Sequence, residues 1–453
     1  MENKTIAAIS TPMGAGGISI IRLSGKDSLQ IARKCFTCKE WEKEEQIEPR
    51  KLNLGKFNAG DFIESCMAVY FKEPFSYTGE DVVEFQCHGG ILIAKGVLNT
   101  LLSNGAVLAG AGEFTKRAFF NGKVSLDEAE GVMDMINAES QAEIKAGYNL
   151  LQGKLHKIVL KQQNHITAML AKIEVVLDYP ENDYEESTLN EIEFKTTEIK
   201  EELEKLVSTS STGMLIKNGT KVVIVGKPNV GKSSLMNAML EYDRAIVTNI
   251  KGTTRDLIEE TYIYKGVKFV LCDTAGVRES NDLVEKIGIE KAVDAINNAD
   301  IVLFVVDGSE AMEEEDFELL NKIIDKNYLI IVNKTDLKQN IVLPNNIDKN
   351  DIINISASSS LGIDNLKERI YNMVISNSAL ESKVIITNER HLEALREAIK
   401  YCDDVILGIH SHNTLDLVSI DLNNVWYALG EITGDTNNEI IIDKIFKDFC
   451  VGK

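Results

Sequence analysis

The feature that most constrains this chain is a glycine-rich segment that runs from Gly226 to Ser233 and reads Gly-Lys-Pro-Asn-Val-Gly-Lys-Ser. It fits the pattern G-x-x-x-x-G-K-[ST], in which the glycines let backbone N–H groups wrap around phosphate groups. The apolar run Val222–Val225 precedes it, and residues 234–240 are expected to form a helix. A strand, this loop and a helix in that order predict an α/β domain with a nucleotide site at the start of the helix.

Around this loop, short apolar runs alternate with helical patterns from Lys221 to about Val374. Such alternation is typical of a parallel sheet whose strands are joined by crossover helices. We expect strands at Val222–Val225, Phe269–Cys272, Ile301–Val306, Leu329–Val332 and Ile352–Ile355.

The chain on either side of this α/β zone has different patterns. From Thr5 to about Asn121, apolar runs alternate with glycine-rich turns, which indicates an α+β domain with several strands. Residues 144–176 place apolar side chains at helical spacing and predict one long helix. The acidic run 181–206 reads as a helix with a solvated face, and the helical period returns after Asn388. One helical domain is therefore interrupted by an inserted nucleotide-binding domain.

These zones give a predicted fold class and domain order. We predict a multi-domain α/β and α protein, with a doubly wound, mostly parallel sheet in the inserted Ras-like P-loop G domain. The predicted domains are an N-terminal α+β domain at 1–121, a first helical part at 122–216, the G domain at 217–378 and a second helical part at 379–453.

Composition narrows the class of protein. The 453 residues carry 49 Lys and Arg against 70 Asp and Glu, a net charge of −21. That balance argues against a generic nucleic-acid coat protein, whose affinity depends on many Lys or Arg contacts to phosphates, and leaves a local basic patch open. No apolar stretch approaches the roughly 20 residues of a membrane-spanning helix, and the start of the chain lacks a signal peptide's pattern. Seven cysteines, an odd number, indicate reduced thiols, so we expect a cytoplasmic protein with no membrane contact.

Further motifs stand where predicted strands end. In Asp273-Thr-Ala-Gly276 the aspartate can hold Mg²⁺ through water and the glycine N–H can meet a γ-phosphate. In Asn333-Lys-Thr-Asp336 the last carboxylate can accept two hydrogen bonds from guanine, and adenine has no matching amino group. Ser356-Ala-Ser358 can offer a backbone N–H to the guanine carbonyl. With the glycine-rich loop, these motifs predict a GTP site.

Two details bear on hydrolysis. Ras-type enzymes place a water-orienting glutamine after Asp-Thr-Ala-Gly, where this chain has Val277. Arg278 and the acidic residues from Glu279 to Glu290 are the nearby candidates to replace it, and Glu285 opens a helical run. Thr254, in Gly-Thr-Thr-Arg-Asp, is suited to close over Mg²⁺ as part of a switch, although Gly-Thr-Thr is also an ordinary turn.

At this point the whole length of the chain resembles a known family, the bacterial and organellar tRNA modification GTPases MnmE (also called TrmE). A closing Cys-(Ile/Leu/Val)-Gly-Lys together with a central G domain is specific to that family. The motifs that carry the resemblance are Thr5-Ile, Ile20-Ile-Arg-Leu-Ser-Gly25, Tyr77-Thr-Gly-Glu-Asp-Val-Val-Glu84, Gly112-Glu-Phe-Thr-Lys-Arg-Ala-Phe-Phe-Asn-Gly-Lys123, the G-domain motifs and Phe449-Cys-Val-Gly-Lys453.

The resemblance implies a potassium-activated GTPase. With an FAD-dependent partner, MnmG, the family adds an aminomethyl or carboxymethylaminomethyl group to carbon 5 of the wobble uridine of certain tRNAs. The one-carbon unit comes from a tetrahydrofolate derivative, which we expect in the 5-formyl or methylene form. The N-terminal domain binds folate and forms a constitutive homodimer, the G domains pair during hydrolysis, and MnmG joins in a heterotetramer-type complex.

The resemblance also assigns site residues. The folate positions are Arg22, Glu84, Lys123 and Lys453; the potassium positions are Asn229, Thr248, Ile250 and Thr253; and the magnesium positions are Ser233 and Thr254. Glu285 matches the catalytic glutamate that positions the water indirectly, and Cys450 is the candidate reactive thiol. The expected GTP positions are Asn229, Val230, Gly231, Lys232, Ser233, Ser234, Thr248, Asn249, Ile250, Lys251, Gly252, Thr253, Thr254, Asp273, Thr274, Ala275, Gly276, Asn333, Lys334, Thr335, Asp336, Ser356, Ala357 and Ser358.

Alternatives stay open from the residues alone. Arg22 and Lys123 could form surface ion pairs, and Cys450 could be a small buried hydrophobe. The rival function is a ribosome-assembly or regulatory RNA-associated GTPase, but such relatives carry a second G domain or a G-x-x-G loop, and residues 387–453 contain no such loop. The net charge of −21 suggests that MnmG supplies much of the surface that contacts tRNA phosphates.

Overall fold

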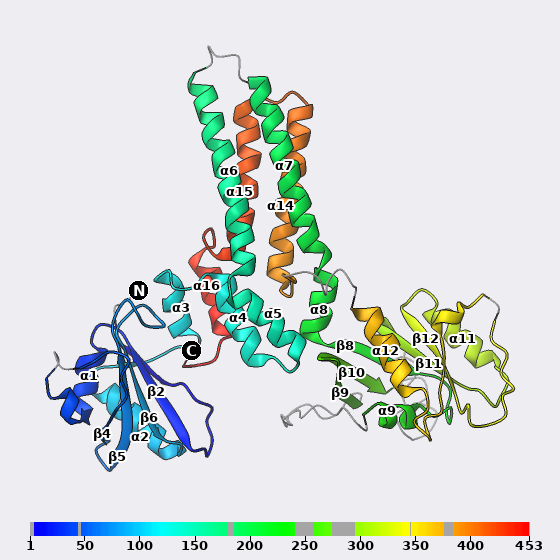
Figure 1. Cartoon of the computed structure of the whole chain (residues 1–453), viewed down its shortest axis with the longest axis horizontal. Coiled ribbons are helices and arrows are strands. Elements are labelled where there is room, and N and C mark those ends of the chain that lie inside the picture. The colour runs from blue at the N-terminus through cyan, green and yellow to red at the C-terminus, as the bar shows by residue number, and fades with distance from the viewer. Residues whose placement is uncertain are drawn as a thin grey trace. The chain divides into compact units, whose positions relative to one another are not determined.

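The computed structural model describes residues 4–43, 47–179, 185–240, 258–273, 295–344, 346–375 and 384–452. The chain divides into two compact units, whose helices and strands are labelled in Figure 1. The first comprises Met1–Met133, Leu150–Lys172 and Leu422–Lys453, and the second comprises Asp134–Asn149 and Ile173–Asp421.

A seven-stranded sheet forms the body of the first unit, in the order β3-β4-β5-β6-β2-β1-β7. Only β1 and β7 pair in parallel; the other neighbours are antiparallel. The apolar faces of two helices, α1 and α2, cover the sheet around Phe36, Phe57 and Phe85. These elements are β1 (Ile6–Ile9), β2 (Ile18–Ser24), α1 (Ser28–Cys35), β3 (Phe36–Thr37), a 3-10 helix (Lys39–Trp41), β4 (Asn53–Asn58), β5 (Ile63–Phe71), β6 (Val82–His88), α2 (Ile91–Ser103) and β7 (Val107–Leu108).

The last described residues of the chain return to this sheet. Val451 forms an antiparallel bridge with Ala111, and the Gly112 N–H donates to the Cys450 carbonyl (3.3 Å). At Gly452 φ is 93°, and a Cβ there would lie 2.3 Å from the Ile9 carbonyl oxygen. Only glycine lets the backbone pass so close to β1 in this conformation.

The second unit contains a six-stranded sheet in the order β13-β12-β11-β8-β10-β9. All its strand pairs are parallel except β9 with β10, so the carboxyl ends of five strands lie along one edge. The strands are apolar on both faces because helices cover both. The elements are β8 (Thr220–Val225), α9 (Lys232–Leu240), β9 (Ile258–Tyr264), β10 (Val267–Asp273), β11 (Ile301–Asp307), α11 (Glu314–Ile323), β12 (Tyr328–Asn333), a 3-10 helix (Lys349–Asp351), β13 (Ile352–Asn354) and α12 (Ile363–Val374).

The sequence prediction missed β9, the antiparallel edge strand. Its sequence, Ile-Glu-Glu-Thr-Tyr-Ile-Tyr, mixes polar and apolar residues and lacks the apolar run that marks the other strands. Its Tyr262 side chain is nevertheless fully buried and stacks on Phe269 of β10, with ring centroids 5.1 Å apart. Pairing with β10, and not local composition, therefore makes these residues a strand.

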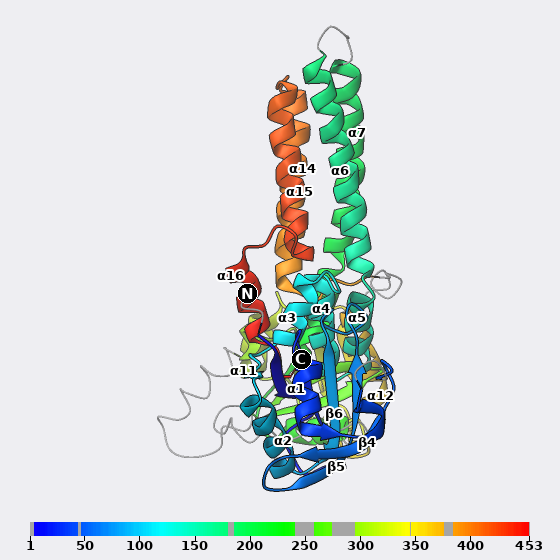
Figure 2. The same cartoon turned by 90° about the vertical axis from the view of Figure 1, so that its left-hand side faces the viewer.

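The remaining elements of the described chain are helices, several of them long. In the second unit α7 and α14 pack side by side (Figure 1, Figure 2), although nearly two hundred residues separate them in sequence. Each contributes a buried apolar stripe, as their helical spacing predicted. The helices are α3 (Glu113–Phe120), α4 (Leu126–Asn137), α5 (Gln141–Leu151), α6 (Lys154–Asp178), α7 (Glu185–Ser208), α8 (Ser210–Asn218), α14 (Glu389–His410), α15 (Leu415–Thr433) and α16 (Glu439–Lys447).

The single long helix predicted over residues 144–176 is wrong. Helix α5 ends at Leu151 and α6 begins at Lys154, with Gly153 between them at φ 64°. A left-handed residue breaks the helix although apolar spacing continues across it, because spacing reports burial and not the backbone angle of one glycine.

The predicted fold class is confirmed: an α+β domain, long helices and a mostly parallel α/β sheet inserted between helical segments. Within the described residues, none of the helices combines the length and apolar character needed to span a membrane.

Candidate functional site

The glycine-rich loop joins β8 to α9 at the carboxyl edge of the second unit's sheet. Gly226 has φ 149°, and a Cβ there would lie 2.3 Å from the Val305 carbonyl oxygen of neighbouring β11. Asn229 is exposed and adopts a left-handed backbone at φ 65°. These conformations bend the chain back so that α9 starts at Lys232, directly after the loop.

Lys232 is folded back over the loop. Its Nζ donates to the carbonyl oxygens of Gly226 and Lys227, each at 2.7 Å, and the residue is buried. Ser233, the next residue, lies exposed in the first turn of α9. The ammonium and the hydroxyl thus sit at the helix N-terminus, where anionic phosphate groups bind favourably.

Asn333 joins three of the predicted motifs. Its side-chain Nδ2 donates to the Val230 carbonyl in the loop (2.8 Å), and its Oδ1 accepts from the Ala357 N–H (3.0 Å). A Cβ at Gly231 would lie 2.2 Å from that Nδ2, which leaves room for glycine alone. Because Asn333 is buried, both hydrogen bonds lie inside the protein and fix the loop relative to the base-recognition motifs.

The two motifs expected to recognise guanine are also adjacent. The Thr335 N–H donates to the Ile355 carbonyl (3.1 Å), and the hydroxyls of Ser356 and Ser358 lie 3.1 Å apart. The Asp336 side chain is exposed beside them. Its carboxylate is therefore accessible to a base.

Asp307, at the end of β11, is a residue that the motif search missed. Its Oδ2 pairs with Lys334 Nζ at 2.5 Å, and its Oδ1 accepts from the N–H and hydroxyl of Ser309. Burial raises the pKa of Asp307, but the bonds from Lys334 and Ser309 outweigh it, so the pKa lies below its usual value. The available signal was an Asp-Gly pair closing an apolar strand.

Several predicted residues of this site lie outside the described part of the chain. They are Thr248, Asn249, Ile250, Lys251, Gly252, Thr253, Thr254, Thr274, Ala275, Gly276 and Glu285, together with Val277 and Arg278. The backbone of Asp273 is described as the last residue of β10. The roles predicted for the residues outside the described part of the chain remain predictions.

A second group of predicted residues meets in the first unit. Arg22 on β2 lies directly opposite Glu84 on β6, and its Nε pairs with Glu84 Oε1 at 2.7 Å. Arg22 does form an ion pair, and because the two side chains are 19% and 16% exposed, this pair is partly buried. The Arg22 Nη1 also donates to the Gly452 carbonyl (3.3 Å), which brings the end of the chain to the same place.

Aromatic rings flank the Arg22 guanidinium. Its central carbon lies 5.7 Å from the centre of the Tyr77 ring and 5.5 Å from that of Phe114, within cation–π range. The Tyr77 hydroxyl and the Thr115 hydroxyl are 2.9 Å apart. Burial raises the pKa of Tyr77, and the Thr115 hydrogen bond and the Arg22 charge oppose that rise only in part. Both rings belong to motifs of the sequence analysis, but neither was named as a site residue.

The remaining predicted folate residues are placed differently. The stem of Lys123 packs on the turn that follows Tyr77: a Cβ at Gly79 would lie 3.4 Å from Lys123 Cγ and 3.5 Å from its Cε. Cys450 is exposed, so its interpretation as a buried hydrophobe is wrong. Lys453 lies outside the described residues.

Comparison with known families gives two matches. The family described as "GTP-binding protein TrmE N-terminus" matches residues 5–123, and the family described as "MnmE helical domain" matches residues 126–450. The second match alone spans more than half of the chain.

Two full-length relatives share one name. A protein of Clostridioides difficile named tRNA modification GTPase MnmE is 43% identical over 454 residues, which cover 99% of each chain. A protein of Desulforamulus reducens with the same name is 42% identical over 461 residues, covering 100% of each. Among solved structures, Era of Aquifex aeolicus is 26% identical and covers 40% of this chain and 66% of that one, but its TM-score is 0.27. Because these relatives match over their full length, the chain belongs to the tRNA modification GTPase MnmE family.

Proposed function

We propose that this chain is a potassium-activated GTPase that, with an FAD-dependent partner, adds an aminomethyl or carboxymethylaminomethyl group to carbon 5 of the wobble uridine of certain tRNAs. Its membership of a family of tRNA modification GTPases supports the general function, GTP hydrolysis in the modification of tRNA. The observation that carries the GTPase assignment is Asn333, whose two hydrogen bonds hold the phosphate loop against the motifs for guanine.

The described residues fit a guanine nucleotide. The loop backbone and Lys232 would bind the phosphates, and the exposed Asp336 carboxylate would accept two hydrogen bonds from the base. Lys232 now bonds two loop carbonyls, and it would exchange these for phosphate oxygens when the nucleotide enters. Charged acceptors are the stronger partners for an ammonium.

Two cations complete the proposal. Ser233, exposed in the first turn of α9, would hold Mg²⁺ together with Thr254. Asn229, exposed in the loop, would hold K⁺ together with Thr248, Ile250 and Thr253. When bound, these ions would neutralise charge that develops on the phosphates, and Glu285 would position the attacking water in place of the absent glutamine.

The Arg22 site fits a tetrahydrofolate derivative. The donors and acceptors of a pterin match a carboxylate, here Glu84, and the Tyr77 and Phe114 rings flank the same position. Lys123 and Lys453 are cations of the kind that a glutamate tail would require. We keep Cys450, exposed in the segment beside this site, as the candidate reactive thiol.

The proposed partners are a second copy of this chain, the FAD-dependent MnmG in a heterotetramer-type complex, and tRNA, in the cytoplasm. A chain with a net charge of −21 is poorly suited to hold tRNA phosphates alone. MnmG would therefore supply much of that surface.

Mass spectrometry of wobble uridines tests the proposal directly. Cells that lack the gene should lose the carbon-5 modification, and the wild-type gene should restore it. A Lys232→Ala variant at equal protein level should fail to restore it, because it loses the phosphate-binding ammonium. Unaltered wobble uridines in the deletion strain would favour the rival ribosome-associated role.

A further inference from the structure

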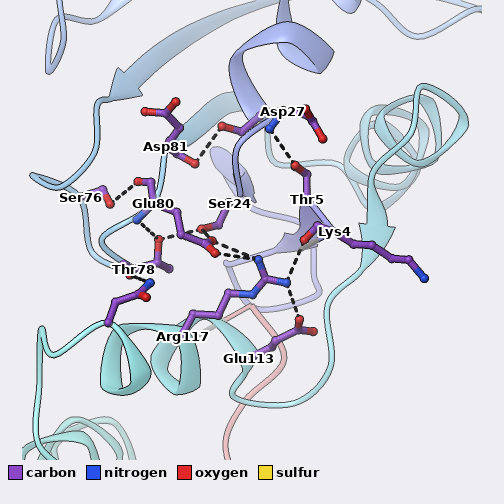
Figure 3. Close-up of polar contacts among 12 residues, drawn as sticks. Lys4, Thr5, Ser24, Asp27, Ser76, Thr78, Glu80, Asp81, Glu113 and Arg117 are labelled. Carbon is purple, nitrogen blue, oxygen red and sulfur yellow. Dashed lines mark hydrogen bonds and ion pairs between the residues drawn. The ribbon is translucent and has the colours of Figure 1, made fainter. Parts of the chain in front are cut away.

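A polar network in the first unit fastens the loop between β5 and β6 to helix α3 (Figure 3). At its centre is Arg117, whose side chain is 10% exposed. Its Nη1 donates to both carboxylate oxygens of Glu80, each at 3.1 Å. Its Nη2 donates to Glu113 Oε1 (2.8 Å) and to the Lys4 carbonyl (3.0 Å). One guanidinium thus joins the loop, the helix and the start of the chain.

Hydrogen bonds from uncharged side chains hold the same loop at further points. The Ser24 hydroxyl donates to Glu80 Oε2 (2.6 Å), and Asn121 Nδ2 donates to the Thr78 carbonyl (2.7 Å). Thr78 itself is fully buried. The pair of Glu80 with Arg117 joins the loop to α3 through two charged groups, so this contact depends strongly on geometry.

The loop supports the site described around Arg22. Tyr77, one of the two rings beside the Arg22 guanidinium, belongs to the loop, and its hydroxyl reaches Thr115 on α3. The other ring, Phe114, belongs to α3 itself. Lys123 rests its stem on Gly79 of the loop. A shift of the loop against α3 would therefore displace both the Tyr77 ring and Lys123.

We propose that Arg117 is a positioning residue for the folate site: through Glu80 it holds the Tyr77 loop against α3, so that Arg22, its flanking rings and Lys123 keep the spacing a folate requires. The inference rests on the folate binding proposed above. Arg117 does not touch the ligand in this assignment; it acts through the loop.

The guanidinium suits this task better than an ammonium would. It is planar and presents several N–H groups in fixed directions, so it can bond the two carboxylates and the carbonyl together. A lysine in its place keeps the positive charge but loses the planar set of N–H donors. The loop should then stay attached to α3 in a less defined position. Removing the charge altogether would leave the Glu80 and Glu113 carboxylates around one emptied position, where they repel.

Titration calorimetry of the full chain with 5-formyltetrahydrofolate tests the assignment. We expect Arg117→Lys to weaken binding about tenfold, because the fork geometry is lost. Arg22→Lys should weaken it more. If Arg117 acts by holding the Tyr77 ring beside the Arg22 guanidinium, adding Arg117→Lys to Arg22→Lys should cost less than about twofold further. Arg50→Lys is the matched control, because exposed Arg50 bonds the carbonyl of Phe75 in the same loop but stands outside the network around Arg117, so the affinity should stay unchanged.

The outcomes separate the two proposals. If the wild-type chain binds no 5-formyltetrahydrofolate, the folate assignment itself is refuted. If it binds and Arg22→Lys weakens binding, but Arg117→Lys does not, the positioning role is overturned; additive losses in the double variant overturn it too. Glu80→Gln, which removes the charge of that side chain and keeps its size, repeats the test if Arg117→Lys unfolds, and an unchanged affinity there also overturns the role.

Discussion

The nucleotide edge of the second unit and the Arg22 site of the first are built in opposite ways. At the nucleotide edge, contiguous motifs stand at strand ends and work largely through backbone groups, with Asn333 joining them. At the Arg22 site, single side chains from β2, β6, the Tyr77 loop and α3 converge with the backbone carbonyl of Gly452. A site built from backbone groups can be recognised in the sequence as a contiguous motif. A site built from side chains of distant segments appears there only as isolated charged residues, which resemble ordinary surface residues.

The largest effect is expected for Asp336→Asn. It exchanges a carboxylate acceptor for an amide, so discrimination in favour of GTP over XTP should fall by about 10⁴-fold, or reverse. Competition binding of the two nucleotides measures it. Unchanged GTP preference would show that the base is recognised elsewhere, and the contrast between the two sites would weaken.

Replacing potassium with sodium should have the next largest effect. If Asn229 helps to hold K⁺ where a glutamine is lacking, GTP turnover should fall by about 10²-fold in sodium at equal ionic strength. Turnover assays in the two chloride salts check this. Asn229→Ala should lower turnover in potassium toward the sodium value, and equal turnover of the wild type in both salts would remove the potassium site.

Arg22→Ala should abolish folate binding and leave GTP binding intact. The change leaves the poorly exposed Glu84 without its guanidinium, and breaking such a pair is costly, so we expect a loss of more than about a hundredfold in affinity. Calorimetry with 5-formyltetrahydrofolate and with GTP on one preparation gives both numbers. Parallel loss of both ligands would point to general unfolding.

The smallest effect concerns pH and Asp307. Because its folded pKa lies below its unfolded value near 3.9, its stabilising contribution is present above about pH 4 and is lost as pH falls through the folded pKa. Asp307→Asn should therefore cost about 1–2 kcal/mol at neutral pH and progressively less in acid. Urea midpoints measured from pH 6 to 3 test this; a difference independent of pH would assign the effect to packing.

The sequence predicted elements wherever one local pattern decides them. Strands β8, β10, β11, β12 and β13 are apolar runs, and their ends carry motifs, so both fold and nucleotide site could be read. It missed β9, whose mixed composition is settled by pairing with β10, and it missed the break at Gly153. The pairs Asp307–Lys334 and Tyr77–Arg22 join residues distant in sequence, and no local pattern announces such contacts.

The return of Gly452 to the first unit also has a consequence for biosynthesis. Gly452 accepts a hydrogen bond from Ser10, 442 residues earlier in the chain, and another from Arg22. The seven-stranded sheet can form early during translation, but the Arg22 site stays unfinished until the helical segments and the nucleotide-binding sheet have all been synthesised. A chain whose synthesis ends within the second unit would therefore contain every strand of the N-terminal sheet but lack the Gly452 carbonyl at the Arg22 site.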